Sequence, residues 1–184
     1  MTIKIWTNKV DNDLYYTTGK ARNQSILHSL KLTSGTALSD RWPEVVIDIT
    51  SDYKPADSFL SGPMLIVSRE LADLIYKFAT DKEVEYLPVE VVYKGNPQGE
   101  YGFLNILNIC DVLDRSNSQF TEIDGMIDSI DLVRIDESAT EGKTIFQLDA
   151  IEWIVCVDKG LAEEIEKTAF TGIAFKSESE WQPF

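Results

Sequence analysis

The chain has 184 residues, 43% of them apolar, and its 17 basic and 31 acidic side chains give a formal net charge of −14. This length predicts one globular domain, and no apolar run approaches the roughly 18 residues of a membrane span. We expect neither nucleic acid nor a membrane as partner, because anionic phosphates are held by clustered Lys and Arg. The first residues lack the apolar segment of a secretory signal, so we expect a cytoplasmic protein.

The negative charge is concentrated in the second part of the chain. Residues 1–109 hold 14 acidic and 11 basic side chains, a net of −3, whereas residues 110–184 hold 17 and 6, a net of −11. Such a surface attracts basic proteins and speeds their association. Acidity also keeps a protein soluble without any partner, so the charge alone leaves both interpretations open.

The N-terminal part predicts few regular elements. A strand is expected at 2–6, a short helix at 22–31 and a strand at 44–49, followed by a Ser-, Pro-, Asp- and Gly-rich loop at 51–63. We expect this loop to divide the chain into two portions within one compact domain. These are a variable N-terminal portion, residues 1–62, that packs on the core, and an α+β core, residues 63–184.

The core portion alternates strands with helices. A helix is predicted from Ser68, which is a good N-cap, and a second from Asp158. The turn "NPQG" joins two strands into an antiparallel hairpin, and "DVLDRS" after it predicts a short helical turn with acids at its positive end. The strands expected in this portion are 64–67, 84–94, 100–110, 130–136, 144–149, 152–157 and 172–176.

One phrase occurs twice, as "LIVSRELADLIYK" at 65–77 and as "VCVDKGLAEEIEK" at 155–167. The residues shared by the two copies are those that a strand buries or that a helix turns toward a sheet, whereas the exposed positions differ. The phrase is therefore scaffold. It predicts two strand–helix–strand units, about 64–93 and 152–176, linked by the hairpin into one mixed β-sheet with the helices mainly on one face.

Catalytic and metal-binding motifs are missing from the sequence. The single histidine, His28, cannot form a zinc site with two distant cysteines, and Cys110 and Cys156 lie in apolar runs typical of buried thiols. "EGKT" resembles the end of a phosphate-binding loop, but Glu137 stands where that motif needs glycine. Asp124, Asp128 and Asp131 lack the spacing of a calcium loop. We expect no enzyme activity and no cofactor.

From "PMLIVSRELADLI" through "YGFLNILNICDVLD" to the closing "TGIAF", residues 63–176 resemble a family of bacterial immunity proteins. These Myxococcus-type proteins belong to polymorphic toxin systems and were formerly classed as a domain of unknown function. The resemblance rests on "LN-x-L-N", an aspartate-bearing turn and "TG-x-x-F". It implies a protein that binds and neutralises a cognate toxin, with contact residues particular to each pair and no active site to transfer.

The acidity suggests how such a protein would act, by covering a basic active-site or substrate surface of the toxin. Two other functions stay open, a homo-oligomeric scaffold or regulatory domain, with a homodimer as one form, and a small carboxylate-based hydrolase. Trp153 is expected in the core and Trp181 as an interface anchor, unless the tail packs back on its own domain. The candidate contact residues are Asp111, Asp114, Glu122, Asp124, Asp128, Glu137, Glu141 and Trp181.

Overall fold

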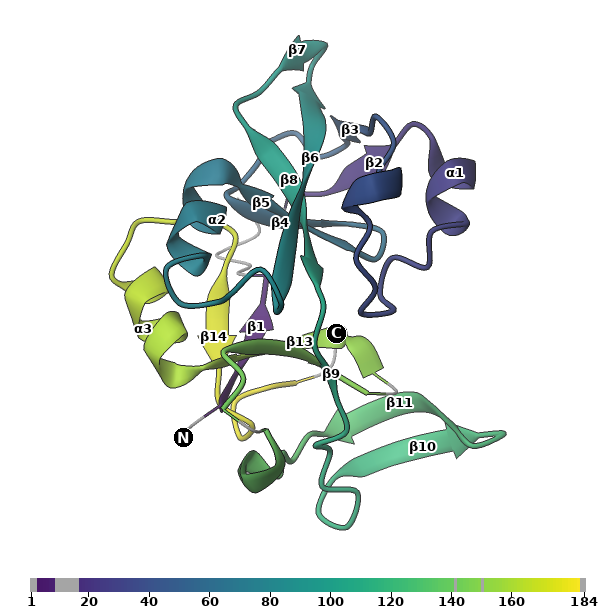
Figure 1. The fold of residues 1–184 in the computed structure, drawn as a ribbon, viewed down its shortest axis with the longest axis vertical. Helices are drawn as coiled ribbons and strands as arrows, with labels where there is room; N and C mark the ends of the chain where they lie inside the picture. Colours follow the sequence, from purple (N-terminus) through teal and green to yellow (C-terminus); the bar gives the residue numbers. More distant parts are fainter. Residues whose placement is uncertain (1–2, 9–16, 141, 150, 183–184) are drawn as a thin grey trace.

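The computed structural model describes residues 3–8, 17–140, 142–149 and 151–182. Over these residues the fold is α+β and mostly β-sheet, with two mixed sheets, a separate two-stranded hairpin and short helices (Figure 1). The helices are α1 (Gln24–His28), α2 (Arg69–Ile75) and α3 (Lys159–Glu166), with 3-10 turns η1 (Ser39–Arg41) and η2 (Glu137–Ala139). None of the helices in the described part of the chain is long and apolar enough to cross a membrane.

The first sheet has five strands in the order β14-β1-β13-β12-β9. All its pairings are antiparallel except that of β9 with β12. Its strands are β1 (Ile3–Thr7), β9 (Ile109–Cys110), β12 (Ile145–Leu148), β13 (Ile151–Asp158) and β14 (Ala174–Lys176).

The second sheet has seven strands, in the order β2-β3-β6-β8-β5-β4 with β7 paired to β6. Strands from both sides of residue 62 build it, because β2, β3 and β4 precede that residue and the others follow it. The division into portions 1–62 and 63–184 stays a prediction. The strands are β2 (Gly19–Ala21), β3 (Val46–Ile49), β4 (Ser58–Ser61), β5 (Met64–Ser68), β6 (Val84–Tyr93), β7 (Asn96–Pro97) and β8 (Tyr101–Ile106).

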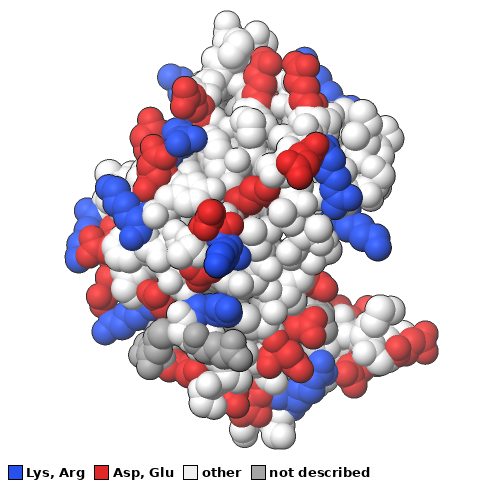
Figure 2. All heavy atoms as spheres, viewed as in Figure 1, with Lys and Arg blue, Asp and Glu red and all other residues white. Residues whose placement is uncertain are grey.

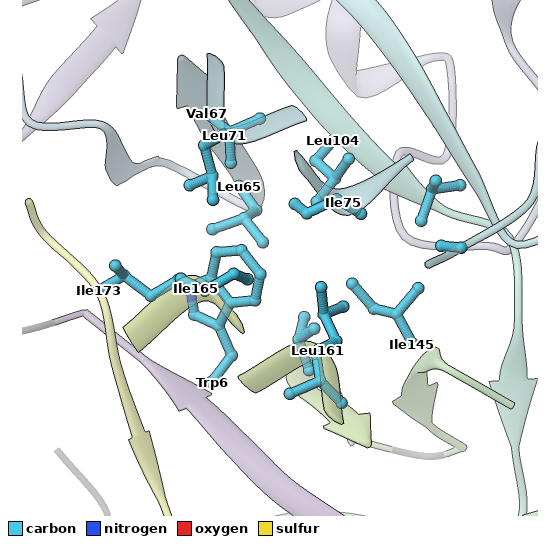
Figure 3. Packing of buried hydrophobic residues seen from close by; sticks show 14 of the residues in the cluster. Trp6, Leu65, Val67, Leu71, Ile75, Leu104, Ile145, Leu161, Ile165 and Ile173 are labelled. Atoms are coloured by element: carbon cyan, nitrogen blue, oxygen red, sulfur yellow. The ribbon is translucent and has the colours of Figure 1, made fainter. Parts of the chain in front are cut away.

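The repeated phrase forms the joint between the two sheets. The Ser68 hydroxyl accepts a hydrogen bond from Leu71 N at 3.4 Å, and the Asp158 carboxylate accepts one from Leu161 N at 2.8 Å, so both helices begin with the same cap. Apolar side chains of α2 and α3 enter one core that both sheets share, with Trp6 of β1 among them (Figure 3). The repeat thus supplies packing.

The expectation of one mixed sheet is wrong, because β5 and β13 belong to different sheets. Within 64–93, β8 lies between β5 and β6; within 152–176, β1 lies between β13 and β14. In neither segment does the helix link two neighbouring strands. The strand between β13 and β14 is β1, which comes from the other end of the chain. No local sequence pattern indicates that β1 pairs there.

Other local expectations also need correction. The segment 51–63, expected as a loop, contains β4, which pairs with β5. The helical turn expected at 111–116 is displaced to the single turn after Asp114, whose carbonyl oxygen accepts from Asn117 N and Ser118 N, whereas Leu113 forms an isolated antiparallel bridge with Ile135. The strand expected at 130–136 is β11 (Met126–Leu132), and its partner β10 (Gln119–Ile123) was not predicted.

Candidate partner-binding surface

A hairpin projects from the body of the molecule beside the five-stranded sheet. It consists of β10 and β11, which form a sheet of their own, and residues 119–132 are called the arm below (Figure 1). The ladder continues below it, because Asp114 N donates to Arg134 O and Asp136 N donates to Val112 O, both at 2.8 Å. Residues 111–118 and 133–137 are therefore the base of the arm.

The tip of the arm is a two-residue turn of Asp124 and Gly125. Both have positive φ, +53° and +79°, as a type I′ turn requires. Asp and Gly tolerate this left-handed backbone, and the turn's twist matches that of the flanking strands. The sequence "IDGM" therefore fixes where the chain reverses and which residues stand at the tip.

The arm and its base are strongly acidic and carry six of the eight candidate contact residues. Residues 119–132 hold four carboxylates and no basic side chain, and residues 111–137 hold eight acids and two bases, a net of −6 out of −14. Figure 2 shows acidic side chains at the projecting tip. The structure thus gathers acids that are up to 26 positions apart in the sequence along one hairpin.

Within the described residues, Asp124 and Asp128 make no hydrogen bond or ion pair, and both are exposed. The same holds for Asp131, which was not among the candidates. Glu122 is also exposed but pairs with Arg115 at 3.1 Å, and Arg115 lies over the Phe120 ring. An exposed pair of this kind contributes little stability and can exchange for a partner's cation.

The candidates at the base of the arm have more internal contacts. Asp114 accepts hydrogen bonds from Ser116 N and from the Asn117 backbone and side chain, and these bonds, that of the Asn117 side chain first, lower the pKa of Asp114. Glu137 accepts a hydrogen bond from Ile3 N at 3.0 Å, which ties η2 to β1. Asp111 is exposed. Glu141 lies outside the described residues.

The tip also presents apolar surface. Ile123 is 56% exposed and Met126 70% exposed, on either side of the Asp-Gly turn. Large apolar side chains surrounded by carboxylates at a projecting end are costly for a free protein and typical of contact surfaces. This feature was not predicted, although the dipeptide "DG" between apolar residues is a strong hairpin signal in the sequence.

The structure contradicts the expectation for Trp153 and agrees, for Trp181, with the alternative in which the tail packs back on its own domain. Trp181 is only 4% exposed and packs in the core of the five-stranded sheet, so the tail folds back on its own domain and leaves this side chain little surface for a partner. Trp153, expected in the core, is 57% exposed on β13. The ring centroids of the two lie 6.3 Å apart, so Trp181 supports the inner face of Trp153.

The described residues offer little machinery for catalysis. Cys156 is buried, which raises the pKa of its thiol and keeps it protonated, and His28 is exposed on α1. Across the described ranges, no three His, Cys, Asp or Glu side chains are grouped so that they could hold a metal ion. The arm itself presents exposed carboxylates and, at its tip, the exposed side chains of Ile123 and Met126.

Comparison with known proteins agrees with the expected family. The model of the immunity protein family (Imm11) matches residues 15–179, which includes most of the N-terminal portion as well as the segment from residue 63. No curated protein matches the chain. Because the match covers far more than half of the sequence, the chain belongs to the Imm11 immunity protein family.

Proposed function

We propose that this chain neutralises a cognate toxin by binding it with the arm and covering a basic active-site or substrate surface. Membership of the immunity family supports the toxin as the partner. The observation that carries the binding mode is the arm itself, a projecting hairpin with four carboxylates, no basic residue and an exposed apolar tip. The acids attract a basic surface, and the tip supplies contact area that excludes water.

The contact residues we propose are Glu122, Asp124 and Asp128 from the arm, with Asp111 at its base. Asp131 joins them because it is exposed on the same hairpin. Asp114 and Glu137 hold the base of the arm in place through backbone hydrogen bonds, and we assign them a positioning role. A substrate-like row of carboxylates suits a nuclease or another toxin whose cleft binds anions.

The charge of the arm can be tested with two matched variants. The first combines Glu122→Gln, Asp124→Asn, Asp128→Asn and Asp131→Asn. The second removes the same four charges from exposed acids in or beside the seven-stranded sheet, through Asp40→Asn, Glu44→Gln, Glu90→Gln and Glu100→Gln. Both variants have the same net charge, so they differ only in where the charge is lost.

We expect the arm variant to capture the toxin about tenfold more slowly at low salt, and the control variant to stay close to wild type. The difference should shrink above 0.15 M salt, where the screening length falls to about 8 Å. Stopped-flow association with the toxin whose lethality this chain relieves in cells measures both rates. Equal rates for the two variants would place the contact surface elsewhere.

A further inference from the structure

A small recess lies between the two sheets, at the open end of the core that they share. It encloses about 80 Å³. Its floor is apolar, formed by Leu65, Leu104 and Val155 from three different strands, and Leu60 and Trp153 stand at its rim.

Three of the residues that line this recess, Trp6, Asn8 and Gln147, carry a buried polar atom without a hydrogen-bond partner. The Gln147 and Trp6 side chains are each only 7% exposed, yet Gln147 Oε1 and Trp6 Nε1 make no hydrogen bond within the described residues, nor does Asn8 Oδ1. Strand alternation explains the direction of Gln147, because Phe146 and Leu148 on β12 enter the other core while Ile145 and Gln147 face the shared one. Buried polar groups are normally satisfied, so this grouping requires an explanation.

The chemistry of the recess restricts what can fill it. The indole N–H of Trp6 donates and the amide oxygens of Gln147 and Asn8 accept, so the occupant needs both an acceptor and a donor. The apolar floor disfavours a charged group. An amide meets both conditions, and its three non-hydrogen atoms fit a space that would hold two or three waters at about 30 Å³ each.

The rim of the recess presents exposed apolar side chains that a partner protein could contact. Trp153 is largely exposed and is backed by Trp181, which limits the rotamers that it can adopt. Leu60 is 38% exposed on the opposite side of the recess. A tryptophan that packs on a second ring and lies beside a pocket with unsatisfied polar groups is typical of an interface hot spot.

We propose that the recess receives the side-chain amide of an Asn or Gln carried on a loop of the toxin. This inference rests on the proposed function for the identity of the partner, but the recess and its preference for an amide can be tested without any toxin. The arm attracts the partner and the recess anchors it.

The first test uses acetamide as the probe, with acetate and methylammonium as charged controls. The protein labelled with ¹⁵N is titrated while the indole N–H signal of Trp6 and the side-chain amide signals of Gln147 are followed. We expect saturable shifts with acetamide alone, and their loss in Gln147→Leu or, if that variant folds poorly, in Gln147→Met. The same small, unsaturated drift with all three probes means that the recess holds ordered water only, and it overturns the proposal.

The second test measures dissociation of the toxin from Gln147→Leu and from Gln24→Leu, an identical substitution at an exposed glutamine on α1. We expect about fivefold faster dissociation or more for the first variant, because a buried amide on the toxin loses its partner, and no change for the second. Acetamide binding together with a wild-type dissociation rate for Gln147→Leu would show that the toxin does not use the recess, which overturns this inference and leaves the proposed function intact. If the wild-type chain binds no toxin, both the proposed function and this inference are contradicted.

Discussion

Ser68 and Asp158 occupy equivalent positions in the repeated phrase, and each caps the helix that follows it. Substitution to alanine removes the acceptor for the third backbone N–H of the helix, so we expect Ser68→Ala and Asp158→Ala each to lower the free energy of unfolding by about 1 kcal/mol. Urea denaturation measures this loss. Ser25→Ala is the control, because Ser25 is an exposed residue inside α1 and forms no cap. Values for all three variants within 0.3 kcal/mol of zero, as a rough limit, would mean that packing alone defines these helices.

Glu85 ties the η1 region to the centre of the seven-stranded sheet. Its carboxylate accepts hydrogen bonds from Leu38 N at 2.8 Å, Ser39 N at 2.9 Å and Asn105 Nδ2 at 3.0 Å. Partial burial by itself would raise the pKa of Glu85, but these hydrogen bonds outweigh it and the pKa lies below 4.5.

A carboxylate whose pKa is lower in the folded than in the unfolded protein stabilises the fold at any pH above its unfolded pKa. This stabilisation is lost as the pH falls through the pKa of the folded state. We therefore expect Glu85→Gln to be less stable than wild type by about 1 kcal/mol at pH 7, and the difference to shrink as the pH falls below about 4.5. Denaturation midpoints across this pH range measure both effects. A difference that is constant with pH would show that the charge of Glu85 is unimportant.

At the residue scale, the sequence predicts well where local chemistry decides the outcome. Both caps and the buried positions of the repeat lie where the pattern places them. Trp153 was misplaced and the burial of Trp181 was left open, because both depend on tertiary contacts of the tail, where the two rings meet, and because the pairing of β12 with β13 shifts register between Gln147 and Leu148. Among the contact candidates, the acids were named from exposure and charge, which single residues do reveal.

The arm can be removed as a unit. Phe120 pairs with Ile130, so residues 121–129 can be replaced by Asn-Gly to leave a short hairpin with both of these side chains retained in the core. We expect the melting temperature to stay within a few degrees of wild type, because the deleted residues are mostly exposed. Neutralisation of the toxin in cells and binding to it in solution should be lost. A shortened variant that still protects cells would contradict a central role for the arm.

At the element scale, the sequence predicts which segments form strands or helices better than it predicts which strands pair with each other. Nearly every long strand and both capped helices could be read from apolar periodicity, but β10, with the sequence "QFTEI", was not predicted. The split into two sheets depends on long-range pairings such as Lys4 with Val157, whose energies come from tertiary packing. The candidate surface follows the same rule, since the acids proposed as contacts could be named from the sequence, and stay a prediction, whereas the hairpin that gathers them was not foreseen.

The whole molecule combines a rigid joint with a charged extension. The shared core, with α2 and α3 at its centre, joins the two sheets, and the arm projects beside the five-stranded sheet (Figures 1 and 3). Four carboxylates on each arm would repel the arm of a second copy, which is consistent with the proposed binding of a basic toxin surface. If the toxin surface is basic, as proposed, a preformed acidic surface of this kind favours rapid capture with little rearrangement.

The proposed function requires that the chain inactivates its toxin by forming a stable complex of one chain with one toxin molecule. Titrating a fixed amount of active toxin with increasing amounts of this chain, and measuring the residual toxin activity after equilibration, tests this directly. We predict a linear decline that ends at equimolar amounts and full recovery of activity when the complex is separated. Complete, time-dependent inactivation by a small fraction of one equivalent, with toxin that stays inactive after separation, would show turnover and contradict the account.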